Sequence, residues 1–115
     1  MRDSRGVLKV LQGSNFPFTV KRIFWITDVP KFEVRGKHGH FETQQLLFSI
    51  LGRITLEVIP PNGLESIIVT LDGREAFYLP PGHWVSMVFS TPDDILMVAA
   101  DREYDPTDVF LEPLK

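Results

Sequence analysis

The stretch ITLEVIPPNGLESIIVTLDGREAFYLPPG, residues 54–82, decides the fold class because it holds three short strand patterns separated by turn signals. Its first six residues alternate strictly, with Ile54, Leu56 and Val58 on one face and polar side chains on the other, as in a half-buried strand. PPNG and PPG supply turn residues, and Asp-Gly at 72–73 is a strong signal for a two-residue hairpin. The antiparallel strands predicted here are residues 54–59, 66–71 and 75–79.

The same pattern runs through the rest of the chain. Runs of β-branched, aromatic and aliphatic residues recur at the roughly 8–12-residue spacing that is typical of an antiparallel sandwich or barrel. No long stretch has helical periodicity, and residues 106–113 can hold a single helical turn. The remaining predicted strands are residues 20–27, 34–41, 45–52, 84–90 and 95–101. We therefore predict an all-β fold, a small jelly roll, with residues 1–115 as a single domain.

Composition and charge exclude several classes of protein. Of the 115 residues, 43% are hydrophobic and 23% are charged, which fits a folded globular protein. The formal net charge is -3, so no basic field attracts nucleic acid. We expect neither a membrane span nor a secretion signal, because no apolar run is long enough. The absence of cysteine excludes disulfides and thiolate metal sites, and we expect a cytoplasmic protein.

Two of the three histidines lie one residue apart in RGKHGH, residues 35–40. On a strand, residues i and i+2 point to the same face, so we expect His38 and His40 side by side. Three interpretations are open at this point. The pair is a solvent-facing pair on an edge strand, a pair of metal ligands, or a pair of acid–base groups.

The metal interpretation can be tested on the sequence, because the H-x-H pair resembles the first motif of the cupins. Metal-binding cupins add a glutamate soon after the pair and a third histidine from a later strand. In this chain Gln44 and Gln45 occupy the glutamate window, and Val85 occupies the position of the third histidine. Glutamine brings no negative charge to a divalent cation, and two imidazoles alone make a weak site. A metal site is therefore the least favoured of the three interpretations.

The acid–base interpretation rests on imidazole, which both accepts and donates a proton near neutral pH. Arg35 precedes the pair by three residues and so has the opposite strand parity to His38. A β-bulge at Gly36 would bring both side chains to one face, where the guanidinium could bind phosphate through two hydrogen bonds. On the other face it would form a surface ion pair with Glu33 or Glu42.

Taken in order and spacing, six segments resemble the sugar 3,4-ketoisomerase family of cupin-like proteins. The resemblance covers roughly residues 3 to 110. The family patterns include D-x-R-G-x-L, P-F-x-x-K-R and R-G-x-H-A-H. The matching segments are DSRGVL (3–8), FPFTVKRIFWI (16–26), RGKHGH (35–40), QLLFSILG (45–52), PPGHW (80–84) and ILMVAADREYDPTD (95–108).

The resemblance implies a cupin-type double-stranded β-helix, a homodimer, no metal or other cofactor, and a thymidine-diphosphate-linked 4-keto-6-deoxy sugar as substrate. The reaction moves the carbonyl from C4 to C3 through an enediol, which needs positioned proton carriers and no redox cofactor. A histidine of the H-x-H motif is the expected base in this family, so the resemblance implies that His38 and His40 carry the protons. The substrate-binding residues that it implies are Arg22, Arg35, Gln45 and Trp84.

The chain also departs from the family pattern. Phe41 stands where the family commonly has a basic residue, and Phe24 and Trp25 stand where it often has tyrosines. Val85 replaces a histidine that often follows the late tryptophan, and Asp101 replaces a small hydroxyl residue. These changes keep two alternatives open: an epimerase-type relative that acts on the same class of sugar, and a module that binds a nucleotide sugar without converting it.

A phenol elsewhere in the chain could supply the proton donor. Tyr78 and Tyr104 are candidate general acids if they face the cavity, but alternation does not say which of Phe77 and Tyr78 points inward. Asp93 and Asp94 lie in a TPDD turn, where we expect solvated carboxylates.

Overall fold

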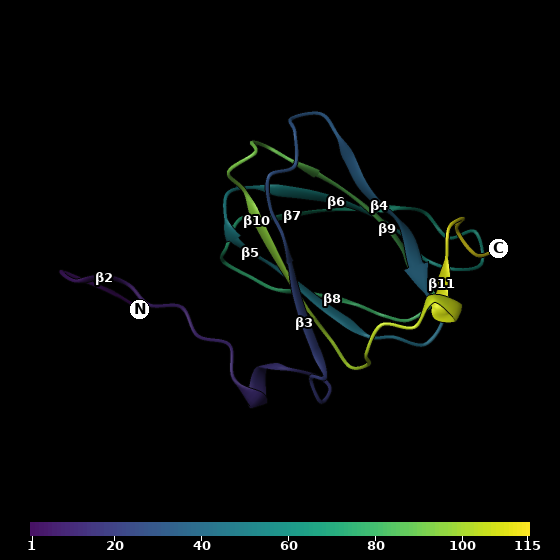
Figure 1. Ribbon diagram of the computed structural model, residues 1–115, viewed down its shortest axis with the longest axis horizontal. Helices are drawn as coiled ribbons and strands as arrows, with labels where there is room; N and C mark the ends of the chain where they lie inside the picture. Colours follow the sequence, from purple (N-terminus) through teal and green to yellow (C-terminus); the bar gives the residue numbers. More distant parts are fainter.

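A computed structural model describes residues 1–115 and shows a β protein with eleven strands and two short 3₁₀ helices (Figure 1). Its elements in chain order are β1 (Arg2–Asp3), β2 (Gly6–Val7), η1 (Gly13–Asn15), β3 (Arg22–Ile26), β4 (Val34–His40), β5 (Gln45–Leu51), β6 (Ile54–Ile59), β7 (Ile67–Leu71), β8 (Phe77–Leu79), β9 (Trp84–Phe89), β10 (Ile95–Ala100), η2 (Pro106–Asp108) and β11 (Val109–Phe110). Each of the eight predicted strands is present, with ends within two residues of those expected.

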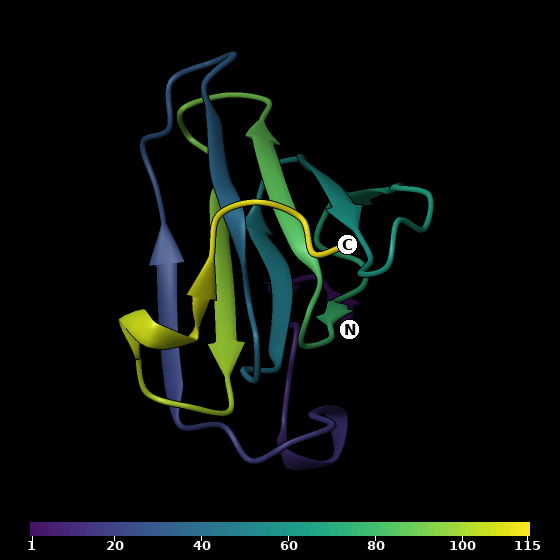
Figure 2. The ribbon, with the colours of Figure 1, turned by 90° about the vertical axis from the view of Figure 1, so that its right-hand side faces the viewer.

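The strands form two antiparallel sheets that pack face to face (Figure 2). One sheet has the order β3-β10-β5-β8 and the other has the order β11-β4-β9-β6-β7, while β1 and β2 form a separate hairpin. Neighbouring strands in both sheets are mostly distant in the sequence, as the crossing connections of a jelly roll require. The all-β cupin-type fold predicted from the sequence is therefore confirmed.

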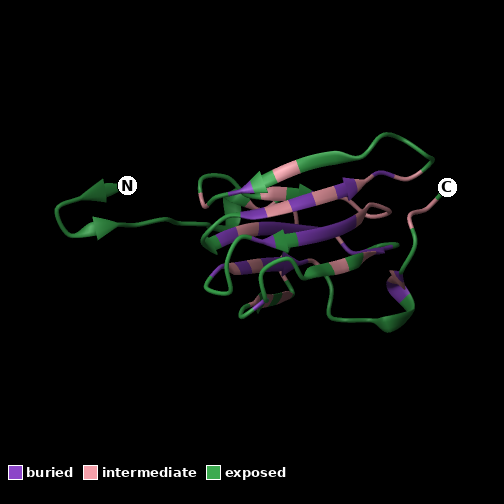
Figure 3. Cartoon of the chain, turned by 90° about the horizontal axis from the view of Figure 1, so that it is seen from above, coloured by how far each residue is buried: buried purple, intermediate pink, exposed green.

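The alternating strand β6 supplies the centre of the core. Ile54, Leu56 and Val58 are each 0% exposed, whereas Thr55 and Glu57 on the opposite face remain partly exposed. Burying one such aliphatic side chain stabilises the fold by about 1.5–3 kcal/mol. The inward side chains of both sheets join them in a single hydrophobic cluster, visible as the purple segments of the barrel in Figure 3.

The prediction of a hairpin at Asp72-Gly73 is wrong. A turn does occur there, since Gly73 has φ +92° and the Asp72 carboxylate accepts a hydrogen bond from the Arg74 N–H. However, β7 before the turn pairs with β6 in one sheet, and β8 after it pairs with β5 in the other sheet. The turn therefore carries the chain across the barrel and does not fold two neighbouring strands together.

The expectation of a solvated Asp94 is also wrong. This side chain is 3% exposed, and its carboxylate accepts hydrogen bonds from the backbone N–H groups and hydroxyls of Ser90 and Thr91. These four donors lower the pKa of Asp94 against the opposing effect of its burial. The carboxylate thus closes the turn between β9 and β10.

Strand β4 contains the β-bulge on which the position of Arg35 depends. Its pairing with β9 slips between Gly36 and His38, which leaves Lys37 as the extra residue with φ +59°. Before the slip Arg35 pairs with Met87, and after it His38 pairs with Val85. Both partners belong to the core and paired residues share a face, so the bulge puts Arg35 and His38 on the same side of the sheet.

The N-terminal segment stands apart from the barrel. Figure 3 shows the β1–β2 hairpin projecting from it on an extended, exposed stretch of chain. Several apolar side chains of this segment are exposed: Met1, Val7, Leu8, Val10 and Leu11. Neither 3₁₀ helix has the length or hydropathy of a membrane span.

Candidate active site

A pocket of about 470 Å³ opens where β3, β4, the loop after β10 and the C-terminal segment meet. Both predicted catalytic histidines contribute to its wall. The residues that line it are Arg22, Phe24, Gly36, His38, His40, Tyr104, Val109 and Leu111. Half of the lining residues are hydrophobic, and the polar ones come from strands β3 and β4 and from the loop after β10.

The two histidine rings lie beside each other, as their spacing on β4 predicts. Their centroids are 5.4 Å apart and their planes are inclined at 76°. His40 is the deeper of the two, at 7% exposure, and its carbonyl accepts a hydrogen bond of 2.7 Å from the Gly82 N–H. The solvent-facing interpretation of the pair is therefore wrong, because both rings face the pocket.

The surroundings of His40 lower its pKa and so favour the neutral imidazole. Burial is the largest cause that lowers its pKa, because it disfavours the charged imidazolium. The neighbouring His38 and the guanidinium of Arg22 lower the pKa further, whereas the carboxylate of Asp108 raises it. A neutral imidazole in this pocket has a ring nitrogen free to accept a proton near pH 7.

Arg22 brings the positive charge of the pocket. It alternates inward from β3 together with Phe24, and its guanidinium carbon lies 4.9 Å from the ring centre of Phe24 and 5.6 Å from that of Tyr104. Its Nε is buried and has no hydrogen-bond partner in the chain. Buried donors are almost always paired, so this one is available to an oxygen atom of a bound molecule.

Tyr104 faces this pocket and Tyr78 does not. The hydroxyl of Tyr78 donates a hydrogen bond of 2.7 Å to the side chain of Gln44, on the outer side of the four-stranded sheet. The sequence left both tyrosines open as proton donors, because alternation does not say which of Phe77 and Tyr78 points inward and because Tyr104 lies in a loop. Tyr104 is therefore the tyrosine that lines the pocket.

Three of the predicted substrate-binding residues lie outside the lining of the pocket. Arg35 lies on the same face of β4 as His38, as the bulge allows, but its side chain is exposed. Gln45 is 4% exposed and points inward from β5, next to Leu79 and Ala100. Trp84 lies on the outer face of β9, where its indole N–H donates to the carbonyl of Leu111 at 2.9 Å. Their contacts with a substrate stay predictions.

The C-terminal wall of the pocket was not expected from the sequence. Val109 and Leu111 reach the histidines because β11 pairs with β4, where Val109 lies opposite His40. Trp84 fixes the same wall through its hydrogen bond to Leu111. No sequence signal links residues so far apart, apart from the Y-D-x-x-D pattern that precedes β11.

The polar side chains of the pocket do not fit a metal site. No three histidine, cysteine or carboxylate side chains come together as ligands anywhere in the chain. Gln45 offers an amide where a metal-binding cupin has a carboxylate, and Val85 offers no donor atom. The arrangement is therefore suited to proton transfer between the two imidazoles and a bound molecule.

A jelly-roll barrel with a histidine pair in its cavity is the arrangement of a cupin-like protein. The chain is a member of one such family, since the family model described as "FdtA: WxcM-like, C-terminal" matches residues 1–113. It is also 34% identical over 108 residues to the TDP-4-oxo-6-deoxy-alpha-D-glucose-3,4-oxoisomerase of Aneurinibacillus thermoaerophilus, covering 92% of this chain and 76% of that protein.

Solved structures support the same family. The QdtA sugar 3,4-ketoisomerase of Thermoanaerobacterium thermosaccharolyticum in complex with TDP is 31% identical, with a TM-score of 0.89 over 97% of this chain and 82% of that one. A histidine-to-asparagine variant of QdtA in complex with TDP-4-keto-6-deoxyglucose is 30% identical, with a TM-score of 0.89 over 97% of this chain and 81% of that one. The predicted family is confirmed, and the chain is an isomerase of the sugar 3,4-ketoisomerase type.

Proposed function

We propose that this protein moves the keto group between C4 and C3 of a TDP-linked 4-keto-6-deoxy sugar, with His38 and His40 as the proton carriers. The observation that carries the proposal is the histidine pair facing the same pocket as Arg22, in a chain of this family. Relatives named for this activity have been solved with TDP and with the keto sugar. The predicted cytoplasmic location is consistent with this chemistry.

The reaction needs only proton transfers. A neutral imidazole removes the proton on C3, next to the C4 carbonyl, and the electron pair forms the double bond of an enediol as the carbonyl oxygen gains a proton. The oxygen on C3 then loses its proton, the C3 carbonyl forms, and C4 receives a proton. Two imidazoles 5.4 Å apart can serve two adjacent carbons in these steps, and the low pKa of His40 keeps one of them neutral at the start.

Arg22 and Tyr104 would hold the oxygen atoms on which charge develops. The unpaired Nε of Arg22 and the rest of its guanidinium can donate to the sugar oxygens or to the diphosphate. The Tyr104 hydroxyl can give a proton to the enediolate oxygen and take it back, the role for which no phenol is present at Phe24 or Trp25. Arg35 lies on the same face of β4 as His38, and we propose that it contacts the diphosphate at the mouth of the pocket.

We also propose that the protein is a homodimer that joins through the outer face of the four-stranded sheet. The register of β3, β10 and β5 puts two rows of apolar side chains on this face, Trp25–Met97–Phe48 and Ile23–Ala99–Leu46. Leu46 and Ala99 are buried within the chain, whereas Ile23 and Trp25 are exposed. The outer face of the other sheet is mixed, since Thr55, Glu57, Thr70 and Ser86 lie there together with Ile68, Trp84 and Val88. An antiparallel sheet that faces solvent usually has a polar outer face. The apolar outer face of the four-stranded sheet therefore favours burial against a second copy of the chain.

The function is tested by incubating the protein with TDP-4-keto-6-deoxyglucose in deuterated water and following the sugar protons by NMR. We expect deuterium at C4 of a new 3-keto product and at C3 of the returning substrate. His38→Asn and His40→Asn should each reduce turnover by about 100-fold or more while the protein still binds TDP. His83→Asn is the matched control, because His83 lies outside the pocket lining.

The outcomes separate this function from its alternatives. Exchange with a product inverted at C3 or C5 and still bearing the 4-keto group would favour the epimerase. Binding of the nucleotide sugar without exchange would favour the non-catalytic module and overturn the isomerase. Loss of activity on treatment with a chelator, restored by a divalent ion, would revive the metal-dependent alternative.

A further inference from the structure

We propose that Asp108 is the positioning residue of the site: its carboxylate fixes the turn that follows His40 and holds a negative charge beside that imidazole. The role rests on the proposed isomerase function and concerns a residue that does not line the pocket. Asp108 is 6% exposed, and a buried carboxylate is costly unless it is paired. The hydrogen-bond partners of the Asp108 carboxylate therefore indicate its role.

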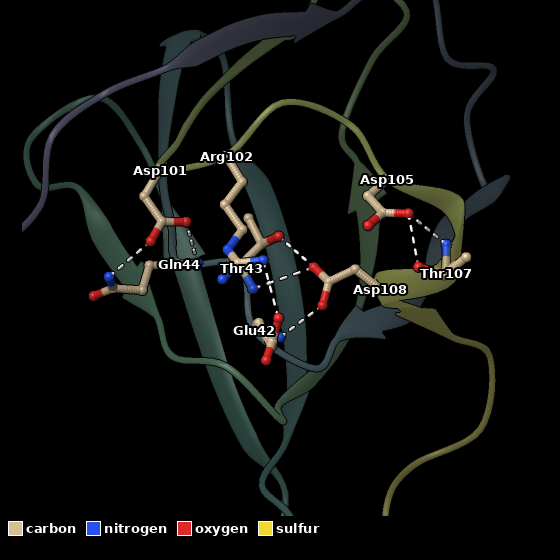
Figure 4. Close-up of polar contacts among 8 residues, drawn as sticks. All are labelled: Glu42, Thr43, Gln44, Asp101, Arg102, Asp105, Thr107 and Asp108. Carbon is tan, nitrogen blue, oxygen red and sulfur yellow. Dashed lines mark hydrogen bonds and ion pairs between the residues drawn. The ribbon is translucent and has the colours of Figure 1, made fainter.

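The carboxylate binds the chain immediately after the histidine pair. It accepts hydrogen bonds from the backbone N–H of Glu42 at 2.8 Å, from the N–H of Thr43 at 3.2 Å and from the Thr43 hydroxyl (Figure 4). The carbonyl of Asp108 accepts a further bond of 2.8 Å from the N–H of Phe41. All three residues that follow His40 are thus bound to this one residue.

The same residue joins two walls of the pocket. Immediately after Asp108, Val109 pairs with His40 and Phe110 pairs with Gly39 in the β11–β4 ladder. The backbone of His40 is therefore held on one side by β11, on the other by its bond to Gly82, and at its end by the Asp108 turn. A carboxylate with several donors in this position restricts the direction in which the imidazole can point.

The charge of Asp108 also acts on the imidazole. The charged and titratable groups that face His40 are Arg22 from β3, His38 from β4 and Asp108 from η2, with the phenol of Tyr104 in the same pocket. Asp108 is the only carboxylate among them, and it raises the pKa of His40 against the combined effect of burial, His38 and Arg22. Without it, His40 would be a weaker base and the imidazolium formed in the reaction would lack its counter-charge.

A matched pair of variants tests this role. Asp108→Asn removes the charge and keeps the size of the side chain. Asp101→Asn makes the same change at a carboxylate that binds the N–H and side-chain amide of Gln44 at 2.8 and 2.9 Å but does not act on His40 (Figure 4). The His40 imidazole is titrated by NMR in each protein, with its signal assigned from His40→Asn.

We expect Asp108→Asn to lower the pKa of His40 and to move the acid limb of the kcat profile in the same direction. At neutral pH kcat should fall about ten-fold while KM changes less than about two-fold, since the base is weakened and less well oriented. Asp101→Asn should leave both the titration and kcat unchanged. A purely structural role for Asp108 would reduce stability without moving the titration.

Two outcomes would overturn the proposal: an unchanged His40 titration in Asp108→Asn, or an equal shift in Asp101→Asn. If Asp108→Asn does not fold, Thr43→Val is used, because it removes one donor from the carboxylate and lets it move away from His40. A shift in the same direction is then expected, and no shift contradicts the proposal. The titration needs no turnover, so an inactive wild-type protein would refute the proposed function without deciding the role of Asp108.

Discussion

The ring of Phe110 occupies the space that a side chain on Gly39 would need. A Cβ at Gly39 would overlap the edge of that ring and approach the carbonyl oxygen of His83 within 2.5 Å. Gly39 separates the two histidines of the site, and Phe110 comes from β11, which pairs with it. In this chain the packing of the Phe110 ring over the histidine strand therefore depends on the absence of a side chain at position 39.

Gly39→Ala should therefore destabilise the protein, although the related family pattern has alanine at this position. Inserting a methyl group into a packed contact costs about 1–3 kcal/mol, and the strand must shift to accept it. We expect a loss of that size in the free energy of unfolding by urea, with reduced turnover because His38 and His40 move with the strand. Gly13→Ala is the control, since nothing lies within 4 Å of a Cβ there.

A second substitution can relieve the overlap. Shortening the ring in Gly39→Ala, Phe110→Leu should recover part of the lost stability relative to the sum of the two single changes, because neighbouring residues are not additive. Strictly additive losses would show that the ring of Phe110 is not what excludes a side chain from position 39.

The alternating pattern of β6 made its burial predictable, because three aliphatic residues at a spacing of two have one stable placement, against a core. The Asp72-Gly73 hairpin failed for a physical reason. Turn chemistry specifies that the chain reverses locally, but the next strand pairs wherever its apolar face is best buried. For β8 that place is beside β5 in the opposite sheet.

The site was predictable where it depends on local geometry and unpredictable where it depends on the fold. The i, i+2 spacing placed His38 and His40 on one face, and the resemblance added Arg22. Arg22 and Tyr104 come from opposite ends of the chain and form a cation–aromatic contact. No local sequence pattern predicts that contact. Trp84 shows the converse: its match to a family residue could not reveal that β9 turns it to the outer face.

The lowered pKa of His40 gives the stability of the protein a defined pH dependence. The unfolded chain takes up this proton near the usual histidine value of 6.5, whereas the folded chain takes it up only at lower pH. Between these values the unfolded state binds more protons, so folding becomes weaker as the pH falls. We expect the free energy of unfolding to decrease below about pH 6.5, and His40→Asn to remove this part of the slope.

The measurement compares urea unfolding of the wild type, His40→Asn and His83→Asn from pH 7.5 down to about pH 5. His83→Asn should follow the wild type. If the free energy of unfolding changes equally with pH in the wild type and in His40→Asn, then His40 is protonated in the folded protein as easily as in the unfolded one.

The hydroxyl of Tyr104 can be tested separately from its ring. Tyr104→Phe keeps the ring that lies 5.6 Å from the Arg22 guanidinium carbon and removes only the proton donor. If the hydroxyl protonates the enediolate oxygen, kcat should fall about 100-fold with little change in KM. Tyr78→Phe removes a hydroxyl on the outer side of the sheet and should leave kcat unchanged. An active Tyr104→Phe variant would assign that proton transfer to the histidines or to water.

The proposed dimer makes a prediction about the outer face of the four-stranded sheet. Trp25 is 63% exposed there and pairs with Met97, the middle residue of the row Trp25–Met97–Phe48. Trp25→Glu places a charge in that row and should convert the dimer to a monomer, measured by light scattering after gel filtration. Ile68→Glu is the control, because Ile68 is also 63% exposed but lies opposite Glu57 on the other sheet. A wild-type protein that runs as a monomer, or a Trp25→Glu variant that stays dimeric, would contradict this interface. A monomeric but fully active Trp25→Glu variant would further show that each pocket is complete within one chain.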